Sequence, residues 1–263
     1  MITNIDKNYI KKMVEEGKRV DGRKFDEMRK IEIKKGYLEK AEGSALVKIG
    51  DTEVVVGVKM EIGEPFPDSP DEGVLMVGSE LSPISSPEFE TGPPSEDAIE
   101  LARVVDRGVR ESKTLDFKKL CIEEGEKVWR VCVDIQIIND DGNLIDASSI
   151  GAIAALSNTK IPKIDGDKID RSEFTGKLEL KNIPIACTIV KINGKLLIDP
   201  TFEEGNSTEG RITITSIDDG SLCAMQKGNI GGFTPEEIYK AVDLSIKEGK
   251  KIREMVLVAK DEN

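Results

Sequence analysis

Four carboxylates follow an apolar run in the last third of the sequence. Residues 196–215 read LLIDPTFEEGNSTEGRITIT, so Asp199 ends the apolar run and Glu203, Glu204 and Glu209 lie among Gly, Asn, Ser and Thr. Carboxylates on a loop after a strand can hold Mg²⁺ or serve in acid–base catalysis. The same residues also suit an acidic turn without a ligand. On residue types alone the two alternatives are close, and the turn is favoured because most acidic turns bind nothing.

Three arginines repeat at helical spacing within residues 96–114, EDAIELARVVDRGVRESKT, a segment that predicts a helix. They are Arg103, Arg107 and Arg110. Their i, i+4, i+7 spacing puts them on one face, and Asp106 and Glu111 flank that stripe without joining it. The stripe is either a solvated face with local ion pairs or a ladder of guanidinium groups for phosphates.

A second acidic segment lies between a predicted strand and a predicted helix. Residues 140–149 read DDGNLIDASS, and a helix placed in this way offers its N-terminus to anions. However, Asp140, Asp141 and Asp146 would repel an anion, and no Lys or Arg follows Gly142 as a P-loop requires. We therefore interpret Asp146 as a residue of the helix N-terminus without a ligand.

Histidine is absent from the 263 residues, and this restricts the possible chemistry. The chain cannot use a Ser–His or Cys–His nucleophile, a histidine-ligated zinc ion or a histidine general base. The net charge of −12 argues against a generic nucleic-acid-binding protein, because such proteins are normally basic. A narrow strip of Lys or Arg would still contact phosphates.

The cysteines and the apolar runs exclude further classes. The four cysteines are widely spaced and form no CxxC pair, so neither a disulfide framework nor a zinc site is predicted. No apolar run reaches the roughly 20 residues of a membrane span. The first 20 residues, MITNIDKNYIKKMVEEGKRV, lack the apolar core of a signal peptide. These features predict a cytoplasmic protein without a membrane partner.

The first part of the chain predicts a helix over 4–18 and then a strand-rich block. SALVKI and TEVVVGVKM predict a hairpin that turns around Gly50 and Asp51. Residues 61–97 hold seven prolines and ten carboxylates but no Lys or Arg, which predicts a long acidic loop with one strand in GVLMVGSEL. VWRVCVDIQIIND predicts a strand and SSIGAIAAL a helix of small residues.

The second part repeats this order of strands followed by a helix. IACTIVKINGKLLIDPT, residues 185–201, predicts strand, turn and strand, and RITITSID and SLCAMQKG predict two more. A last helix begins after Thr234, with Pro235 at its first position and Glu237 completing a capping box. The polar segment 162–177 is interpreted as a connector. Strands then helices, twice, predict an α/β or α+β protein of two similar lobes.

The ordered combination of several segments resembles the RNase PH family. These segments are RVDGR…R (19–29), EGSALVKIGDTEVVVGVK (42–59), ELARVVDRGVRES (100–112), the strand–DDGN–helix with IAAL, and LLIDPTFEE. The resemblance covers nearly the whole chain. Within the family, the chain most resembles the non-catalytic RNase PH-like ring subunits of the archaeal exosome. It implies an α+β RNase PH-like fold of two βαβ-type halves that resemble ribosomal protein S5 domain 2. The expected parts are an N-terminal helix and arm (1–30), a first half (31–165), a connector (166–184) and a second half (185–263).

The resemblance also implies partners and an activity. Active family members degrade RNA from its 3′ end by phosphorolysis, in rings of six subunits. For this chain the resemblance implies a trimer of heterodimers with a catalytic RNase PH-like subunit, together with RNA-binding cap proteins and single-stranded RNA. It implies no cofactor and no metal for this subunit.

Two catalytic elements of active members are missing here. They carry a phosphate loop Gly-Gly-Thr/Ser-Arg, where this chain reads Gly-Asn-Leu-Ile-Asp from Gly142 to Asp146. They also carry two aspartates six residues apart, and an ungapped match puts Gly205 and Arg211 at those positions, whereas a gap of one residue would bring Glu204 into place. Glycine has no carboxylate, and arginine cannot act as a base.

The third element, the arginine-bearing helix, is present. The resemblance therefore favours RNA binding by Arg103, Arg107 and Arg110, with no catalytic residue in this chain. One alternative is an active phosphorolytic exoribonuclease that uses Glu203, Glu204 or Glu209. Another is a metal-dependent phosphohydrolase built on the carboxylates between Asp199 and Glu209.

Overall fold

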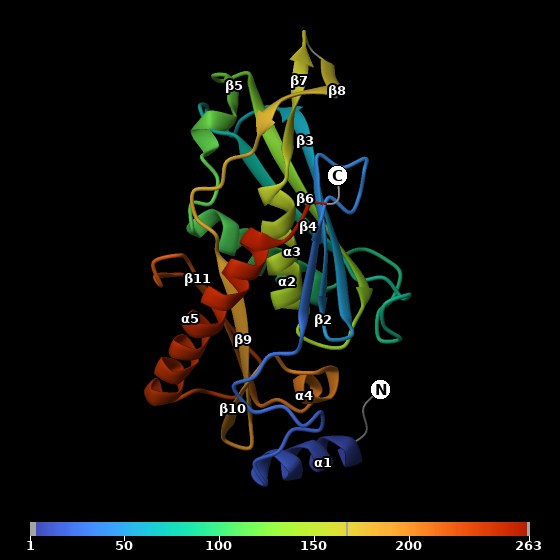
Figure 1. Ribbon diagram of the computed structural model, residues 1–263, viewed down its shortest axis with the longest axis vertical. Coiled ribbons are helices and arrows are strands. Elements are labelled where there is room, and N and C mark those ends of the chain that lie inside the picture. Colours follow the sequence, from blue (N-terminus) through green and yellow to red (C-terminus); the bar gives the residue numbers. More distant parts are fainter. Residues whose placement is uncertain (1–3, 167, 262–263) are drawn as a thin grey trace.

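The computed structural model describes residues 4–166 and 168–261, which form one elongated body of mixed helices and sheets (Figure 1). Its largest sheet contains six strands from the first part of the chain, in the order β1-β2-β3-β6-β4, with β5 also paired to β6. They are β1 (Ile31–Lys35), β2 (Gly43–Ile49), β3 (Thr52–Gly63), β4 (Val74–Glu80), β5 (Cys121–Glu123) and β6 (Lys127–Asn139). No helix in the described part of the chain is both long enough and apolar enough to cross a membrane.

The hairpin expected around Gly50 and Asp51 is confirmed as β2 and β3, which pair antiparallel. Gly50 has a φ of 58°, a left-handed conformation that glycine adopts without strain. The strand expected inside the acidic loop is also confirmed as β4. It runs parallel to β6 and forms an edge of the sheet.

Two helices pack against this sheet. They are α2 (Glu96–Glu111), which contacts β4, and α3 (Leu144–Ser157), which contacts β2 and β3. Every residue of α3 from Ile145 to Leu156 is buried, because α3 also packs against α2 and against β9 of the second part of the chain. The helix expected from SSIGAIAAL is therefore present and begins four residues earlier than that segment. A helix covered on all sides needs small and apolar residues throughout.

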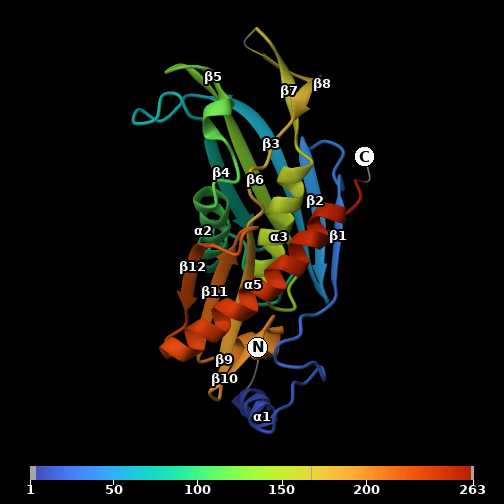
Figure 2. The ribbon, with the colours of Figure 1, turned by 60° about the vertical axis from the view of Figure 1, so that its left-hand side comes forward.

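The second sheet has four antiparallel strands in the order β10-β9-β11-β12. They are β9 (Ile185–Ile192), β10 (Lys195–Ile198), β11 (Gly210–Ser216) and β12 (Leu222–Gly228), with the short helix α4 (Phe202–Asn206) between β10 and β11. The last helix, α5 (Pro235–Val258), lies across β9 and β11 (Figure 2). Its start is as predicted, with Thr234 and Glu237 forming a reciprocal capping box. The expected α+β fold is confirmed.

The segment interpreted as a polar connector is different in the structure. The strands β7 (Lys160–Asp165) and β8 (Lys168–Lys177) pair antiparallel and project from one end of the body (Figure 1). Ile161, Ile164 and Ile169 pack against the main core. Their spacing of three and five residues is not the period of two that predicts a strand, and the sequence therefore favoured a connector. The remaining elements are α1 (Asn4–Glu15) and the 3-10 helix η1 (Phe117–Leu120). Helix α1 confirms the expected N-terminal helix, although it ends at Glu15 and not at residue 18.

Candidate functional site

The carboxylate that opens the acidic stretch, Asp199, is fully buried among cations. Its Oδ2 accepts from Arg23 Nη1 at 2.9 Å, and its two carboxylate oxygens accept from the Arg29 guanidinium at 2.8 and 3.0 Å. Asn143 Nδ2 donates to Oδ1 at 2.7 Å. Burial alone would raise the pKa of Asp199, but the hydrogen bonds and charge of Arg29 lower it below its ordinary value. Asp199 is therefore an anchor for the N-terminal arm.

Glu204 forms a second buried ion pair with the same arm. Its carboxylate accepts from Arg19 Nε at 2.9 Å and Nη2 at 2.5 Å, and both side chains are almost completely buried. The same carboxylate completes a capping box with Thr201 at the start of α4. Arg19 and Arg23 stand in the RVDGR motif, and the structure assigns both a role in holding the arm to the second half of the chain.

The other two carboxylates also make local contacts. Glu203 accepts from Thr201 Oγ1 at 3.0 Å, and Glu209 accepts from the Asn193 backbone N–H at 3.1 Å. The four acids thus contact different groups and do not converge on one point. In the described part of the chain, no three or more Asp, Glu, Cys or His side chains are arranged to hold a metal ion. The acidic stretch is a set of structural contacts in this chain.

A pocket of about 340 Å³ lies beside the turn at residues 142–145, and we call it the turn pocket. Gly205 of α4 and Arg211 of β11 both line it, as do Gly142 and Asn143. The structure thus brings together two segments that lie about 60 residues apart in sequence, namely the 142–145 turn and the positions matched to catalytic aspartates. Gly142 and Asn143 have φ values of 84° and 58°, which turn the chain sharply into α3.

Asp146 lies below this turn and is fully buried. Its carboxylate accepts from the Thr188 backbone N–H at 2.9 Å and from Asn143 Nδ2 at 2.9 Å, and it is 2.7 Å from Thr188 Oγ1. Burial raises the pKa of Asp146 to about 7, although the hydrogen bonds from Thr188 and Asn143 oppose this shift. Asp146 is in the first turn of α3, as predicted, and it joins that helix to β9.

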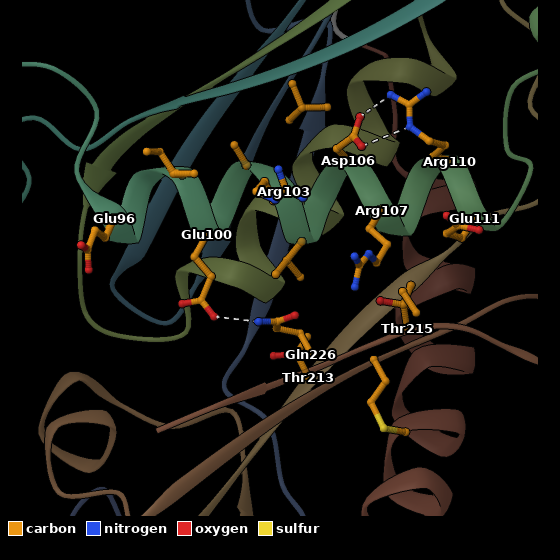
Figure 3. A pocket seen from close by; sticks show the side chains of 16 residues that line it. Glu96, Glu100, Arg103, Asp106, Arg107, Arg110, Glu111, Thr213, Thr215 and Gln226 are labelled. Atoms are coloured by element: carbon orange, nitrogen blue, oxygen red, sulfur yellow. Dashed lines mark hydrogen bonds and ion pairs between the residues drawn. The ribbon is translucent and has the colours of Figure 1, made fainter. Parts of the chain in front are cut away.

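The arginines of α2 line a second, larger cavity of about 690 Å³, which we call the arginine groove. Its opposite wall consists of β11 and β12 residues Thr213, Thr215, Ala224, Met225 and Gln226. All three arginines are exposed, and Arg107 points across the groove towards Thr215 (Figure 3). Within the described residues Arg103 and Arg107 form no ion pair.

Arg110 differs from the other two arginines. Its Nη2 donates to Asp106 Oδ1 at 2.8 Å and to the Leu75 carbonyl oxygen at 3.2 Å, and its guanidinium lies 5.7 Å from the centre of the Phe117 ring. Asp106 flanks the stripe and pairs with Arg110, which is one of the local ion pairs that the first of the two alternatives allowed. The i, i+4 spacing of Asp106 and Arg110 allows the pair, and Figure 3 shows the two hydrogen bonds from Arg110 Nε and Nη2 to the Asp106 carboxylate.

Glu100 is a groove residue that the sequence analysis did not identify. Its Oε1 accepts from Arg211 Nη2 at 2.5 Å and from Gln226 Nε2 at 3.3 Å, so it connects α2 to β11 and to β12. No signal in the sequence could have revealed this, because Glu100 and Arg211 are 111 residues apart. Glu100 lines both the arginine groove and the turn pocket.

Comparisons with known proteins agree with this architecture. Residues 27–162 match the model of the 3′ exoribonuclease family, domain 1, and residues 182–248 match that of domain 2. The chain is 49% identical to "Exosome complex component Rrp42" of Methanocella arvoryzae over 97% of this chain and 96% of that one. It is 51% identical to the protein of the same name from Thermoplasma acidophilum, with the same coverage.

A solved structure is similar over nearly the same length. A chain of "archaeoglobus fulgidus exosome with RNA bound to the active site" superposes with a TM-score of 0.90 at 48% identity, covering 96% of this chain and 98% of that one. The sequence resemblance is therefore confirmed, and this chain belongs to the RNase PH, or 3′ exoribonuclease, family.

Proposed function

We propose that this chain is a non-catalytic subunit of an exosome ring that degrades RNA by 3′→5′ phosphorolysis. It binds single-stranded RNA and shapes the active site of a catalytic RNase PH-like partner in the cytoplasm. The two alternate in a trimer of heterodimers on which RNA-binding cap proteins dock. The relatives' names and the RNA-bound structure of a similar chain support this assignment.

The observation that carries the non-catalytic role is the chemistry of the turn pocket. Its walls hold Gly205 and Arg211 at the positions matched to catalytic aspartates, and residues 142–145 where active members carry a phosphate loop with a Thr/Ser–Arg pair that this chain lacks. The nearby carboxylates make other contacts. Glu204 is paired with Arg19 and Asp199 with Arg29, whereas Glu203 accepts from Thr201 and Glu209 from the Asn193 backbone. The lowered pKa of Asp199 makes that carboxylate a poor proton acceptor.

The RNA-binding role rests on the arginine groove. Arg103 and Arg107 present two exposed guanidinium groups on one helix face, and guanidinium groups suit phosphate oxygens. Arg110 lies on the same stripe, although its charge is shared with Asp106. We assign RNA contact to all three, with the larger part carried by Arg103 and Arg107.

A phosphate-dependent RNA degradation assay tests the proposal. The purified chain alone is expected to release no nucleoside diphosphate from RNA, whereas mixing it with the catalytic relative is expected to restore or increase that partner's activity. Phosphorolysis by this chain alone would overturn the non-catalytic assignment. Native mass measurement of the mixture is expected to show three copies of each chain.

A second measurement tests the groove. Reversing the charge at Arg107 and Arg110 is expected to weaken RNA capture by the assembled ring. Lys163 of the projecting hairpin is the matched control, because it is also exposed but lies outside the groove. Equal RNA affinity of the variant and the unchanged ring would remove the groove from the proposal.

A further inference from the structure

A bridge of three side chains separates the arginine groove from the turn pocket, and it consists of Glu100, Arg211 and Gln226. Glu100 comes from α2, Arg211 from β11 and Gln226 from β12, and the two contacts of the Glu100 carboxylate cross the space between the helix and the sheet. Both cavities include Glu100 in their walls, whereas Arg211 lines the turn pocket and Gln226 lines the groove. The bridge therefore stands where the two cavities meet.

The residues around Arg211 hold its guanidinium in position against Glu100. Arg211 pairs directly with Gly228 across β11 and β12, and its guanidinium lies against that glycine. A Cβ at position 228 would come within 2.6 Å of Arg211 Nη2, so glycine leaves the space that the guanidinium occupies. Glu100 is the one carboxylate that pairs with Arg211 among the described residues. The two side chains are only 23% and 32% exposed, so solvent screens the pair incompletely.

The two sides of the bridge differ in the cations that they offer. The groove is lined by Arg103, Arg107 and Arg110 together with the carboxylates of Glu96, Glu100, Asp106 and Glu111. Arg103 and Arg107, which are exposed and unpaired among the described residues, are the groups that attract a phosphate backbone. The described residues that line the turn pocket include four carboxylates, those of Glu88, Asp97, Glu100 and Asp140, and one cation, Arg211, which Glu100 already neutralises. RNA that is held in the groove would meet a carboxylate at the boundary and an acidic cavity behind it.

We propose that the Glu100–Arg211 pair is a specificity-determining barrier that keeps the RNA 3′ end out of the turn pocket. The inference rests on the proposed RNA-binding function of the groove. A pocket without catalytic groups would hold a 3′ end unproductively, and the barrier leaves that end free to reach the partner's active site. Glu100 acts here as a positioning residue, because it directs the RNA without taking part in the reaction.

Photocross-linking in the assembled ring without phosphate tests the barrier. One RNA carries 4-thiouridine as its 3′-terminal nucleotide, and a second carries it several nucleotides upstream. In the unchanged ring we expect upstream cross-links to peptides of α2 and none from the 3′ nucleotide to α4, whose Phe202 and Asn206 line the turn pocket. In a Glu100→Ala/Arg211→Ala variant we expect 3′ cross-links to α4.

A charge-swapped variant, Glu100→Arg/Arg211→Glu, is the matched control. It keeps the net charge and can restore the pair, so we expect it to lose the α4 cross-links again. A purely structural role for the two residues would not predict this rescue. Circular dichroism and ring assembly check that each variant folds.

The outcomes separate the barrier from the proposed function. Cross-links from the 3′ nucleotide to α4 that are as abundant in the unchanged ring as in the double-alanine variant would overturn the barrier. The barrier would also be overturned if the double-alanine ring gave α2 cross-links but no cross-links from the 3′ nucleotide to α4. If the upstream nucleotide gave no cross-links to α2 in the unchanged ring, the proposed RNA-binding function would be overturned. The barrier, which rests on that function, would be overturned with it.

Discussion

The arginine groove and the turn pocket use the same residue type in opposite ways. In the groove, Arg103 and Arg107 are exposed and have no ion-pair partner among the described residues. Around the turn pocket, Arg29 and Arg211 each face a carboxylate, and Arg19 is buried against Glu204 nearby. An arginine that is already paired and buried contributes to the fold, whereas one left unpaired at the surface is available to an anionic ligand. Pairing, rather than residue type, separates the two regions.

Breaking the buried pair should have the largest effect. Glu204→Ala leaves the Arg19 guanidinium buried without its carboxylate, and such a loss typically costs about 3–5 kcal/mol in the free energy of unfolding. Denaturant unfolding followed by circular dichroism measures this. The exposed Lys163–Glu173 pair is the matched control, and Glu173→Ala should cost less than about 1 kcal/mol because that pair is solvated. Equal losses in both variants would contradict the role given to burial.

Asp146 sharpens the comparison among the buried acids, because it lacks the arginine that Asp199 has. A pKa raised to about 7 means that the folded chain binds the proton more tightly than the unfolded chain. The protonated Asp146 therefore stabilises the folded chain fully below about pH 4. As the pH rises from there to about 7 this contribution is lost, and the free energy of unfolding falls by at most about 1.4 kcal/mol per pH unit. Asp199 acts in the opposite sense, since its lowered pKa makes stability fall as the solution becomes acidic.

The Asp146→Asn variant isolates this contribution. Asparagine mimics the protonated carboxyl, because its oxygen can accept from Thr188 N–H and Asn143 while its amide donates to Thr188 Oγ1. The unfolding free energy of the variant, relative to the unchanged chain, should rise between pH 4 and pH 7. A difference that stays constant over this range would show that Asp146 does not titrate there.

The unpaired arginines should have a smaller effect that depends on salt. Arg103→Ala and Arg107→Ala should each lower the slope of log affinity for single-stranded RNA against log salt by roughly 0.7 in the assembled ring. Arg110→Ala should lower it less, because Asp106 already neutralises that guanidinium. Fluorescence anisotropy over a salt series gives the slopes. Three equal decreases would contradict the distinction between paired and unpaired arginines.

The smallest effect on RNA binding is expected when the paired Arg110 is made an unpaired arginine. Asp106→Asn removes the charge that Arg110 faces, so the salt slope should increase by less than about 0.7 and RNA binding should become slightly tighter. Its cost in stability should be only about 0.3–0.5 kcal/mol, as for other exposed i, i+4 pairs. The same titration, repeated with Asp106→Asn/Arg110→Ala, should remove the gain.

Local signals explain which parts of the fold the sequence predicted. The capping box at Thr234, the turn after Asn193 and the two apolar strands around Gly50 are short-range patterns, so residues close in sequence were enough. The hairpin of β7 and β8 was not predicted because it has few isoleucines among many charged residues. It is stabilised by packing against a core that lies far away in sequence. The sequence left open whether the arginines of α2 form local ion pairs or stay free for phosphates, because spacing alone does not choose between the two, and among the described residues the structure pairs only Arg110.

The sequence by itself determined the family, the order of the elements and the absence of histidine chemistry, because these depend on residue types and their order along the chain. The resemblance to the family also matched Gly205 and Arg211 to the positions of two aspartates in active members, and this match stays a prediction. Only the tertiary structure decided what the remaining charges do. Asp199 and Glu204 meet the N-terminal arm, and Glu100 meets Arg211, across more than 100 residues of chain. Whether a charged side chain is free or paired depends on its burial and on partners from distant segments. Neither property can be predicted from the neighbouring residues in sequence.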